Sequence, residues 1–429
     1  MAKKAEIEQT EIAEPYKLPD GWKWCRLGDV CKFENGYAFK SDKFAEHGTP
    51  VIRITNIKDN EVSLDDCAYT TETSIDERFL VKKGDLLIAM SGATTGKNGI
   101  YWNDDKAYLN QRVGNIKVID TNVLCDKYRN YYIQSKEQEI LLSAYGGAQP
   151  NISSNKISAM AFPLPLTLAE QQRIVNRIET MFAKLDQAQE KAQSVLDSFE
   201  TRKAAILHKA FTGELTANWR KENGVPDESW EEKRLEEICE KIVCGKTPTG
   251  YISSTGEIPY LKVYNISNNN IDFDTIPQFI PKEIHNGKLA SSILKPYDVV
   301  MNIVGPPLRK IAIIPNTYLE WNMNQAIVRF RALSGLNYRY LYWSLINPKT
   351  LSSVIEETRG VVGQQNISVS QSRDLIISVP SLAEQQEIVH ILDSVLEKES
   401  RAKEAAGAVL DQIALLKKSI LARAFRGEL

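Results

Sequence analysis

The sequence has few metal-ligating residues, and they are not arranged as a metal site. None of the six cysteines forms a C-x-x-C pair, and the four histidines form no H-E-x-x-H pattern. We therefore expect reduced, packed thiols and no zinc. There is no apolar run of about 18 residues that could cross a bilayer, and residues 1–14 lack the apolar core of a secretory signal. These absences predict a cytoplasmic protein.

An excess of charge of either sign is also missing. The 53 basic residues nearly balance the 55 acidic ones, which leaves a formal net charge of −2 and excludes a generic basic coat for nucleic acid. Any nucleic-acid site must concentrate positive charge locally or share it with a partner. With 429 residues, of which 43% are hydrophobic and 25% charged, we expect a globular chain of two or more domains.

Signatures of catalysis are incomplete. The nearest approach to the N-P-P-Y type motif of an adenine methyltransferase, V-G-P-P at 304–307, lacks the Asn or Asp and the aromatic residue. The string G-A-T-T-G-K-N at 92–98 is too short for a phosphate-binding loop and ends in Asn where Ser or Thr would bind magnesium. The triplet D-D-K at 104–106, which suggests a metal nuclease, has no counterpart in the second half. The sequence therefore predicts no catalytic centre.

What is present is a unit used twice. L-A-E-Q-Q at 168–172 returns at 382–386, and A-F-x-G-E-L at 210–215 returns at 424–429, both displaced by 214 residues. Upstream, Q-x-N-I-S at 149–153 matches 364–368, and Trp22, Arg26, Leu27 and Cys31 match residues 208 positions later. Because chance does not hold an offset over so many identities, we infer an internal repeat with insertions and deletions in its first part.

Each copy changes its pattern once. Residues 21–165 and 230–380 consist of short β-type runs separated by turn residues, whereas residues 166–215 and 381–429 have a helical period. We predict an α+β fold in which two similar β-rich modules are separated by two long helices, in a pseudo-twofold repeat. Residues 1–20 would form an N-terminal tail and residues 216–229 a linker.

Both helical segments carry heptad seams, in which apolar residues advance in steps of 4 and 3. The seam positions are Ile174, Ile178, Met181, Leu185, Ala188, Ala192, Val195, Phe199 and Ile206 in the first segment, and Ile388, Leu392, Val395, Ala402, Ala406, Val409, Ile413, Leu416 and Ile420 in the second. Such narrow stripes do not stabilise lone helices, so we expect an antiparallel coiled coil; two independent amphipathic helices are the alternative. Arg202 and Glu399 interrupt the seams, either to fix the register or where the seam opens for a partner helix.

This arrangement resembles the specificity subunit of type I restriction-modification systems. The resemblance rests on the paired modules, the repeated L-A-E-Q-Q helices, the Q-x-N-I-S signatures and the A-F-x-G-E-L ends, and it spans residues 22–429. It implies that each module is a target-recognition domain reading one half of a bipartite, asymmetric sequence in double-stranded DNA, and that the helices are spacers that dock two methyltransferase subunits. It also implies a non-catalytic chain without a cofactor, since S-adenosylmethionine, ATP and magnesium would bind the methyltransferase and restriction subunits.

Loops of small polar and basic residues at 91–98 and 305–310 follow equivalent strands and suit contacts with phosphates and base edges. Amides at 110–111 and 324–325 also correspond, and Asn or Gln can bind adenine with two hydrogen bonds. The candidate DNA-binding residues are Arg53, Ser91, Thr94, Thr95, Lys97, Asn98, Asn110, Gln111, Arg112, Lys262, Arg309, Lys310, Asn324 and Gln325. The alternative for each is an ordinary connecting loop, turn cap or solvated strand face. We expect the Gln and Asn of the Q-x-N-I-S signatures to be structural caps.

Two other functions are open at this point. A fused methyltransferase or endonuclease would read its own site, but the missing motifs oppose it, and binding of S-adenosylmethionine by the chain alone would reveal it. A scaffold that binds only proteins would suit the near-neutral charge. Sequence-dependent DNA binding in the presence of a methyltransferase would exclude that scaffold.

Overall fold

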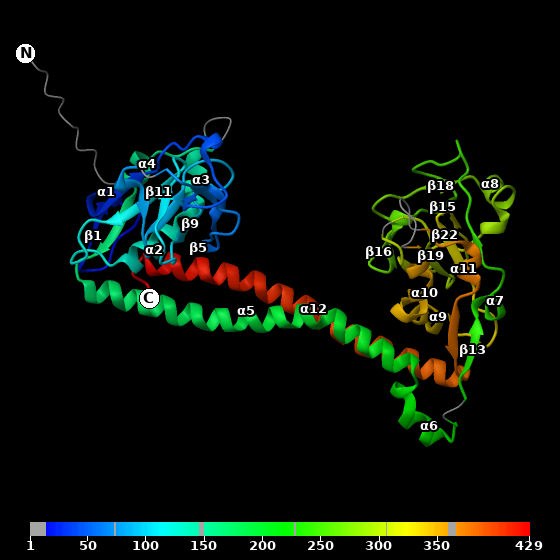
Figure 1. Cartoon of the computed structure of the whole chain (residues 1–429). Helices are drawn as coiled ribbons and strands as arrows, with labels where there is room; N and C mark the ends of the chain where they lie inside the picture. Colours follow the sequence, from blue (N-terminus) through cyan, green and yellow to red (C-terminus); the bar gives the residue numbers. More distant parts are fainter. Residues whose placement is uncertain (1–13, 73, 146–149, 227–228, 306, 359–365) are drawn as a thin grey trace, which may run out of the picture. The chain divides into compact units, whose positions relative to one another are not determined.

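The computed structural model describes residues 14–72, 74–145, 150–226, 229–305, 307–358 and 366–429, and the chain divides into two compact units (Figure 1). Unit 1 contains residues 1–193 and 408–429, and unit 2 contains residues 194–407. Each unit combines one β-rich module with parts of both long helices, α5 (Leu168–Phe211) and α12 (Leu382–Ala424). Within the described ranges, no helix has the length and apolar character needed to span a membrane.

The module of unit 1 is built on two sheets with strand orders β2-β11-β8-β9-β5-β4 and β6-β3-β10-β7. All four residues of the central strand β8 (Leu86–Ala89) are buried, as expected for an uninterrupted apolar run. Strand β1 (Trp22–Arg26) pairs antiparallel with β12 (Ala161–Pro165) and so closes the module just before α5. The other strands are β2 (Cys31–Asn35), β3 (Thr49–Ile52), β4 (Ile57–Lys58), β5 (Asn60–Val62), β6 (Ala68–Thr70), β7 (Leu80–Val81), β9 (Asn98–Ile100), β10 (Ala107–Leu109) and β11 (Val113–Val118).

The module of unit 1 also contains short α-helices. They are α1 (Leu27–Val30), α2 (Asp126–Ser135), α3 (Glu137–Ala144) and α4 (Ser154–Ser158). Tyr128 and Tyr132 of α2 pack edge-to-face on Phe162 of β12 and on Phe425, the residue that follows α12. The core of unit 1 therefore contains residues from both ends of the sequence.

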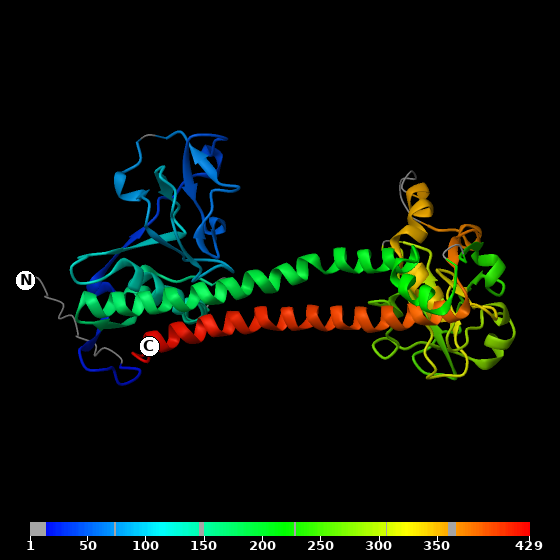
Figure 2. The same ribbon diagram turned by 90° about the horizontal axis from the view of Figure 1, so that it is seen from below.

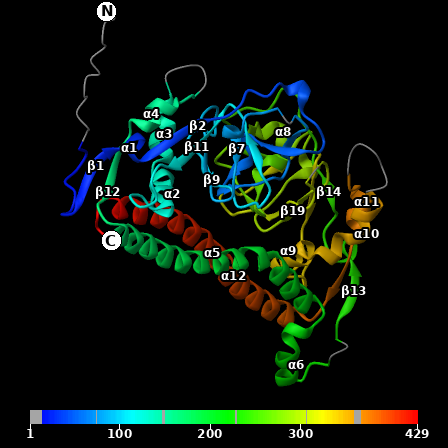
Figure 3. The same cartoon turned by 60° about the vertical axis from the view of Figure 1, so that its left-hand side comes forward.

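The module of unit 2 has sheets with orders β14-β22-β19-β20, β18-β15-β21 and β16-β17, and is closed by β13 (Glu231–Arg234) against β23 (Ile376–Val379). The other strands are β14 (Val243–Cys244), β15 (Ile258–Leu261), β16 (Ile266–Ser267), β17 (Asn270–Ile271), β18 (Phe279–Ile280), β19 (Val299–Asn302), β20 (Ile311–Ile313), β21 (Asn322–Met323) and β22 (Ile327–Phe330). The helices are α6 (Ala217–Asn223), α7 (Leu235–Ile238), α8 (Lys282–Asn286), α9 (Tyr338–Ile346), α10 (Pro348–Thr358) and α11 (Val369–Arg373). Helix α6 lies beside the end of α5, within the predicted linker (Figure 3).

The two modules share their connectivity, which confirms the internal repeat. The order β2-β11-β8-β9 in unit 1 corresponds to β14-β22-β19-β20 in unit 2. Strand β3 is parallel to β10, and the equivalent β15 is parallel to β21. The predicted α+β class is confirmed, whereas the compact units divide within α5 and α12, so the predicted segment boundaries stay predictions.

The repeated L-A-E-Q-Q motif anchors each long helix to its own module. The amide of Gln171 donates to the carbonyls of Pro165 and Val123, and its oxygen accepts from the Cys125 N–H at 2.7 Å. Gln385 makes the equivalent contacts with the carbonyls of Pro380 and Gly335 and with the Asn337 N–H. Both glutamines are fully buried, so their hydrogen bonds fix the start of each helix.

The two long helices pair in antiparallel fashion in both units, as predicted (Figure 2). In unit 1, Lys417 near the end of α12 binds Asp186 in the first half of α5 at 2.5 Å. In unit 2, Arg202 near the end of α5 binds Glu399 in the first half of α12 at 2.8 Å. The two residues that interrupt the seams are therefore partners of each other.

The predicted seam is correct for α5 and for most of α12, but its phase is wrong at three positions. Ala402, Val409 and Leu416 are exposed, whereas Leu410 and Lys417, each one residue later, are partly buried; Lys403 is itself exposed. The Nζ atoms of Lys403 and Lys417 lie 4.4 and 5.7 Å from the ring centres of Phe199 and Phe182. An ammonium over an aromatic ring makes a cation–π contact, so lysines can join the two helices at these positions, and the apolar pattern alone misses that.

The A-F-x-G-E-L ends close the helices in a backbone conformation that requires glycine. Gly213 and Gly427 have φ of +80° and +73°. A Cβ atom on Gly427 would lie 2.2 Å from Cγ of Pro19, and the Tyr16 hydroxyl donates to the carbonyl of Phe425 at 2.8 Å. The segment before β1 therefore packs on the end of α12.

Candidate nucleic-acid interface

Two of the segments predicted to approach DNA, at 91–98 and 110–112, meet the Q-x-N-I-S segment in unit 1. The Met90 N–H donates to the carbonyl of Arg112, and the Gly92 N–H donates to the carbonyl of Pro150, both at 2.9 Å. Ser91 and Asn151 pair as an isolated β-bridge. Together these segments surround a cavity of about 430 Å³, which Gln111 and Arg112 also line.

Several polar groups in this loop cluster are available to a ligand. Lys97, Gln111 and Arg112 are exposed, and their side chains have no hydrogen-bond partner among the described residues. The hydroxyls of Ser91 and Thr94 are shielded from solvent and have no partner in that part of the chain. Since shielded hydroxyls are normally hydrogen-bonded, these two groups are suited to accept or donate a bond to a ligand or water.

Other predicted residues shape the loop cluster. Thr95 and Asn98 are 1% and 3% exposed. The Thr95 hydroxyl donates to the carbonyl of Gly92 at 2.7 Å, and the Asn98 amide donates to that of Gly96 at 3.2 Å. These side chains are occupied within the loop, so their predicted DNA contact stays a prediction.

The remaining two candidates of unit 1 lie at the end of β3. The Asn110 N–H donates to the carbonyl of Ile52, and the Asn110 side chain accepts from the Arg112 N–H at 3.4 Å, the turn-cap role considered as its alternative. Arg53 follows Ile52; it donates to the carbonyl of Asp66 and lies over the ring of Phe44. Asn110 thus orients the turn that presents Arg112.

Unit 2 builds the same loop cluster with different side chains. Val304 and Asn366 form the equivalent bridge, and the Asn324 N–H donates to the carbonyl of Leu261 at 3.0 Å. Val304 replaces Ser91, and Ala326 replaces Arg112. The two units therefore present unlike surfaces on a common backbone.

Most predicted residues of unit 2 have contacts within the module. Gln325 is hydrogen-bonded to Thr247, Arg309 donates to the carbonyl of Pro348 at 3.0 Å, and Lys262 lies 6.0 Å from the ring centre of Tyr264. The oxygen of the Asn324 amide is shielded and has no partner among the described residues. Lys310 is held through its backbone N–H.

A buried residue that sequence analysis did not identify, Asn302, holds the loop cluster of unit 2 in place. Asn302 is 1% exposed; its oxygen accepts from the Lys310 N–H at 2.7 Å, and its amide donates to the carbonyl of Pro307 at 2.9 Å. The equivalent residue in unit 1 is Ala89, which has no polar group. Comparing the copies therefore could not identify it.

The capping role expected for the Q-x-N-I-S signatures belongs to their serines. Ser153 and Ser368 cap α4 and α11 by accepting from the N–H groups of Lys156 and Gln371. Asn151 and Asn366 instead form the bridges described above, so the prediction was wrong for them. Gln149 and Gln364 lie outside the described residues.

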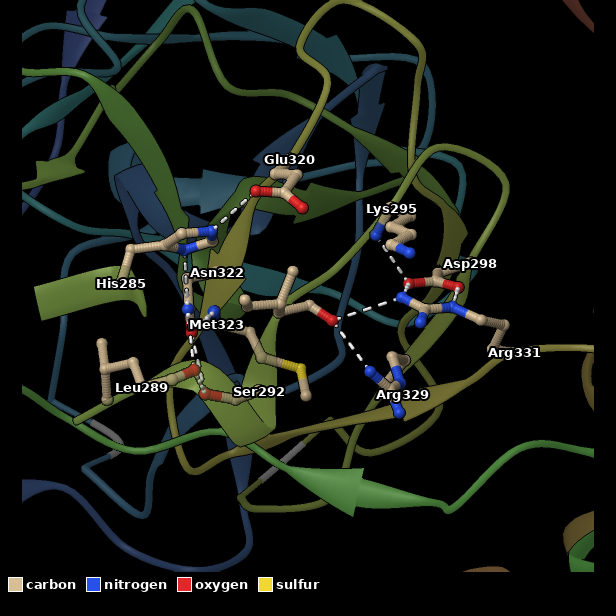
Figure 4. Close-up of polar contacts among 11 residues, drawn as sticks. His285, Leu289, Ser292, Lys295, Asp298, Glu320, Asn322, Met323, Arg329 and Arg331 are labelled. Atoms are coloured by element: carbon tan, nitrogen blue, oxygen red, sulfur yellow. Dashed lines mark hydrogen bonds and ion pairs between the residues drawn. The ribbon is translucent and has the colours of Figure 1, made fainter. Parts of the chain in front are cut away.

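A buried polar network stiffens the module of unit 2 (Figure 4). The Asn322 oxygen accepts from the Met323 N–H and the Ser292 hydroxyl, so its amide nitrogen donates to Nδ1 of His285 at 3.0 Å. Nε2 of His285 therefore carries the proton, which it donates to Glu320 at 3.1 Å. In unit 1 the equivalent of Asn322 is Tyr108, which lies in an apolar cluster.

An ion pair secures the start of the central strand in the same module. Asp298 accepts two hydrogen bonds from Arg331, each at 2.7 Å, which raise the pKa of that guanidinium (Figure 4). Asp298 also caps the preceding turn by accepting from the Lys295 N–H, as Asp85 does from the Lys82 N–H. The equivalent aspartates thus have structural roles in both copies.

Comparisons with known proteins match this architecture. A family model described as the type I restriction modification DNA specificity domain matches residues 19–196 and again residues 227–406. The chain is 25% identical to the EcoBI specificity subunit of Escherichia coli, over 99% of this chain and 90% of that protein, and 22% identical to the EcoKI specificity subunit of E. coli strain K12, over 96% and 90%. Among solved structures, the HsdS subunit from Thermoanaerobacter tengcongensis has a TM-score of 0.64 at 19% identity, over 97% of this chain and 99% of that one. A chain of a type I R-M system, solved to explain complex assembly and conformational transition, has a TM-score of 0.74 at 18% identity, over 97% and 100%.

Proposed function

Because the chain belongs to the family of type I restriction-modification DNA specificity subunits, we propose that each of its modules reads one half of a bipartite, asymmetric DNA target. The observation that supports this most directly is the loop cluster, which recurs in both units with different side chains at equivalent positions. A common backbone with unlike surfaces suits two different half-site sequences.

The free side chains suggest how unit 1 reads its half-site. The amide of Gln111, with a donor and an acceptor, and the guanidinium of Arg112, with two donors, match base edges in the major groove, and Lys97 suits a phosphate. In unit 2 the corresponding candidates are Gln325, Asn324 and Lys310. The phosphate contacts would set the register of each module, and the base contacts would supply the sequence information.

The chain is a non-catalytic subunit, so methylation and cleavage of DNA would depend on its partners. We propose that it carries two methyltransferase subunits, one per repeat, and that restriction subunits join through this complex. S-adenosylmethionine, ATP and magnesium would bind these partners.

Exchange of one module tests this assignment. Residues 230–376 are replaced by the matching module of a relative with another target, and methylated sites are mapped with the methyltransferase present. We expect one half of the target to change while the other half is retained, because base contacts lie within modules. A swap that alters both halves would contradict modular reading, and methylation by the chain alone would favour a fused enzyme.

A further inference from the structure

A second cavity, of about 440 Å³, lies at the base of the module in unit 1. It is bounded by the turn between β4 and β5, the end of β9, and the facing sides of α2 and α5. The exposed loop-cluster residues Lys97, Gln111 and Arg112 do not line this basal groove, although the buried Asn98, also predicted to bind DNA, does. The basal groove and the loop cluster thus share Asn98 but not those three exposed side chains.

The basal groove is strongly acidic. Asp59, Glu61, Glu179 and Asp186 line it, against the single basic residue Lys127. Glu179 binds Lys127 at 2.7 Å, and Asp186 binds Lys417 at 2.5 Å. Asp59 and Glu61 are exposed and have no ion pair within the described ranges. DNA is a poor occupant, since its phosphates would meet the two unpaired carboxylates of Asp59 and Glu61.

Aromatic rings give this groove an apolar surface. Trp102, at the edge of the groove, is 52% exposed. Tyr131 packs edge-on against Phe182, with ring centres 5.9 Å apart. Exposed aromatic rings beside unpaired charges are typical of protein interfaces, where an aromatic anchor packs and surrounding charges select the partner.

Unit 2 has the corresponding groove, of about 360 Å³, without the acidic character. Its ion pair between Arg339 and Asp393, at 2.8 Å, is equivalent to that between Lys127 and Glu179. At the turn, however, Asn268 and Asn270 stand where unit 1 has Asp59 and Glu61. The turn at the groove thus has two carboxylates in unit 1 and two neutral amides in unit 2.

We propose that the basal groove of unit 1 binds a Lys- or Arg-bearing segment of a protein partner. Resting on the proposed function, this partner is the methyltransferase subunit held by the first repeat. The two carboxylates without an ion pair, Asp59 and Glu61, attract the basic side chains, and Trp102 packs against their aliphatic portions. Because the turn carboxylates are exposed, their contribution depends on ionic strength.

The double variant Asp59→Asn/Glu61→Asn in the full chain tests the proposal. Unit 2 already has asparagine at both positions, and Asn268 adopts the same left-handed conformation as Asp59, with φ of 49° and 50°. We expect binding of the purified cognate methyltransferase subunit at low salt to weaken by roughly three- to tenfold, and the difference to vanish at high salt. The matched control Asp42→Asn/Glu46→Gln, which removes two exposed carboxylates elsewhere on unit 1, should bind as the wild type does.

A photo-crosslinking residue in place of Trp102 identifies the occupant. Crosslinks to a Lys- or Arg-bearing segment of the methyltransferase would support the proposal. Crosslinks to DNA or to an acidic segment would overturn it, as would equal binding by the double variant and the wild type at low salt. Failure of the wild-type chain to bind any methyltransferase would instead refute the proposed function.

Discussion

At the scale of single residues, the most informative difference between the copies is Arg112 in unit 1 against Ala326 in unit 2. Each position directly follows two amide residues, at 110–111 or 324–325. In both turns the N–H of the asparagine donates to the carbonyl at the end of the neighbouring parallel strand, β3 or β15. An arginine that is exposed and has no partner among the described residues can pair with guanine through two hydrogen bonds, which alanine cannot.

We therefore predict that Arg112→Ala relaxes recognition at one base pair of the half-site read by unit 1. The expected loss of discrimination is about 1–3 kcal/mol at that pair, with the other half-site unchanged. Competition binding of the assembled complex to single-base-pair variants of the target measures it. Arg78→Ala, which removes an exposed arginine of another loop in the same module, is the control. A uniform loss across all sequences would show that Arg112 contacts a phosphate.

The cysteines give a second prediction at this scale. Burial raises the pKa of Cys25, Cys31 and Cys239 to about 12, so only about one thiol in ten thousand is ionised at pH 8. We expect these three to resist a thiol reagent at pH 8 until denaturant unfolds their unit, while the partly exposed Cys125 and Cys244 react first. Mass spectrometry of each peptide over time measures this. Rapid labelling of Cys25 in the native protein would show that β1 and β12 separate readily.

The sequence could name candidate site residues only by their chemistry. Gln111 and Arg112 were predicted as base readers because amides and arginine commonly bind base edges. Their side chains are exposed, and their DNA contact stays a prediction. Thr95 and Asn98 looked the same in the sequence but are buried and bonded to their own loop, which depends on the path of the backbone. His285 and Asn302 lacked any pattern, since their partners come from strands and turns distant along the chain.

At the scale of elements, the heptad spacing predicted both long helices and their antiparallel pairing, but not the local phase of α12. Lys403 and Lys417 contact the other helix through their ammonium groups, which lie over Phe199 and Phe182, and no hydrophobicity pattern marks them. The strands were predictable where runs are apolar, as in β8. The parallel pairing of β3 with β10 was not, because it joins segments distant in the sequence.

The ion pair between Arg202 and Glu399 makes the two halves of the coiled coil unequal. Displacement by 214 residues relates Arg202 to Leu416 and Glu399 to Leu185, so the equivalent positions in unit 1 are both leucine. A polar pair within an apolar seam can specify the register at some expense of stability. Arg202 also donates to the Val195 carbonyl, which adds a local constraint.

We predict that Glu399→Leu alone lowers the free energy of unfolding by about 1 kcal/mol, because Arg202 then lacks its partner in a partly buried seam. The double variant Arg202→Leu/Glu399→Leu, which places leucine at both positions as the sequence does in unit 1, should be at least as stable as the wild type. Urea unfolding of the three proteins measures both effects. If the double variant loses as much stability as the single variant, the ion pair stabilises the protein by more than keeping Arg202 from being left without a partner.

At the scale of the whole molecule, the helices are predicted to set the distance between half-sites. One heptad inserted after Ala192 and another after Ala406 preserves the seam phase, because these buried residues lie within the antiparallel helices. Seven residues lengthen each helix by roughly 10 Å at about 1.5 Å per residue. On B-DNA this corresponds to about 3 base pairs, so the preferred gap between half-sites should grow by that amount while both half-site sequences stay the same.

The same insertion should also weaken binding. Three extra base pairs rotate one half-site by roughly a quarter to a third of a turn, at about 10 to 10.5 base pairs per turn, so one module must reorient to meet its groove. Selection from a DNA library with randomised spacer length, in the presence of the methyltransferase, measures both gap and sequence. Insertion of seven residues in the loop that contains Asp120 and Asn122, outside the long helices, is the control and should leave the gap unchanged. An unchanged gap in the heptad variant would mean that the DNA or the partners, and not the helices, determine the spacing.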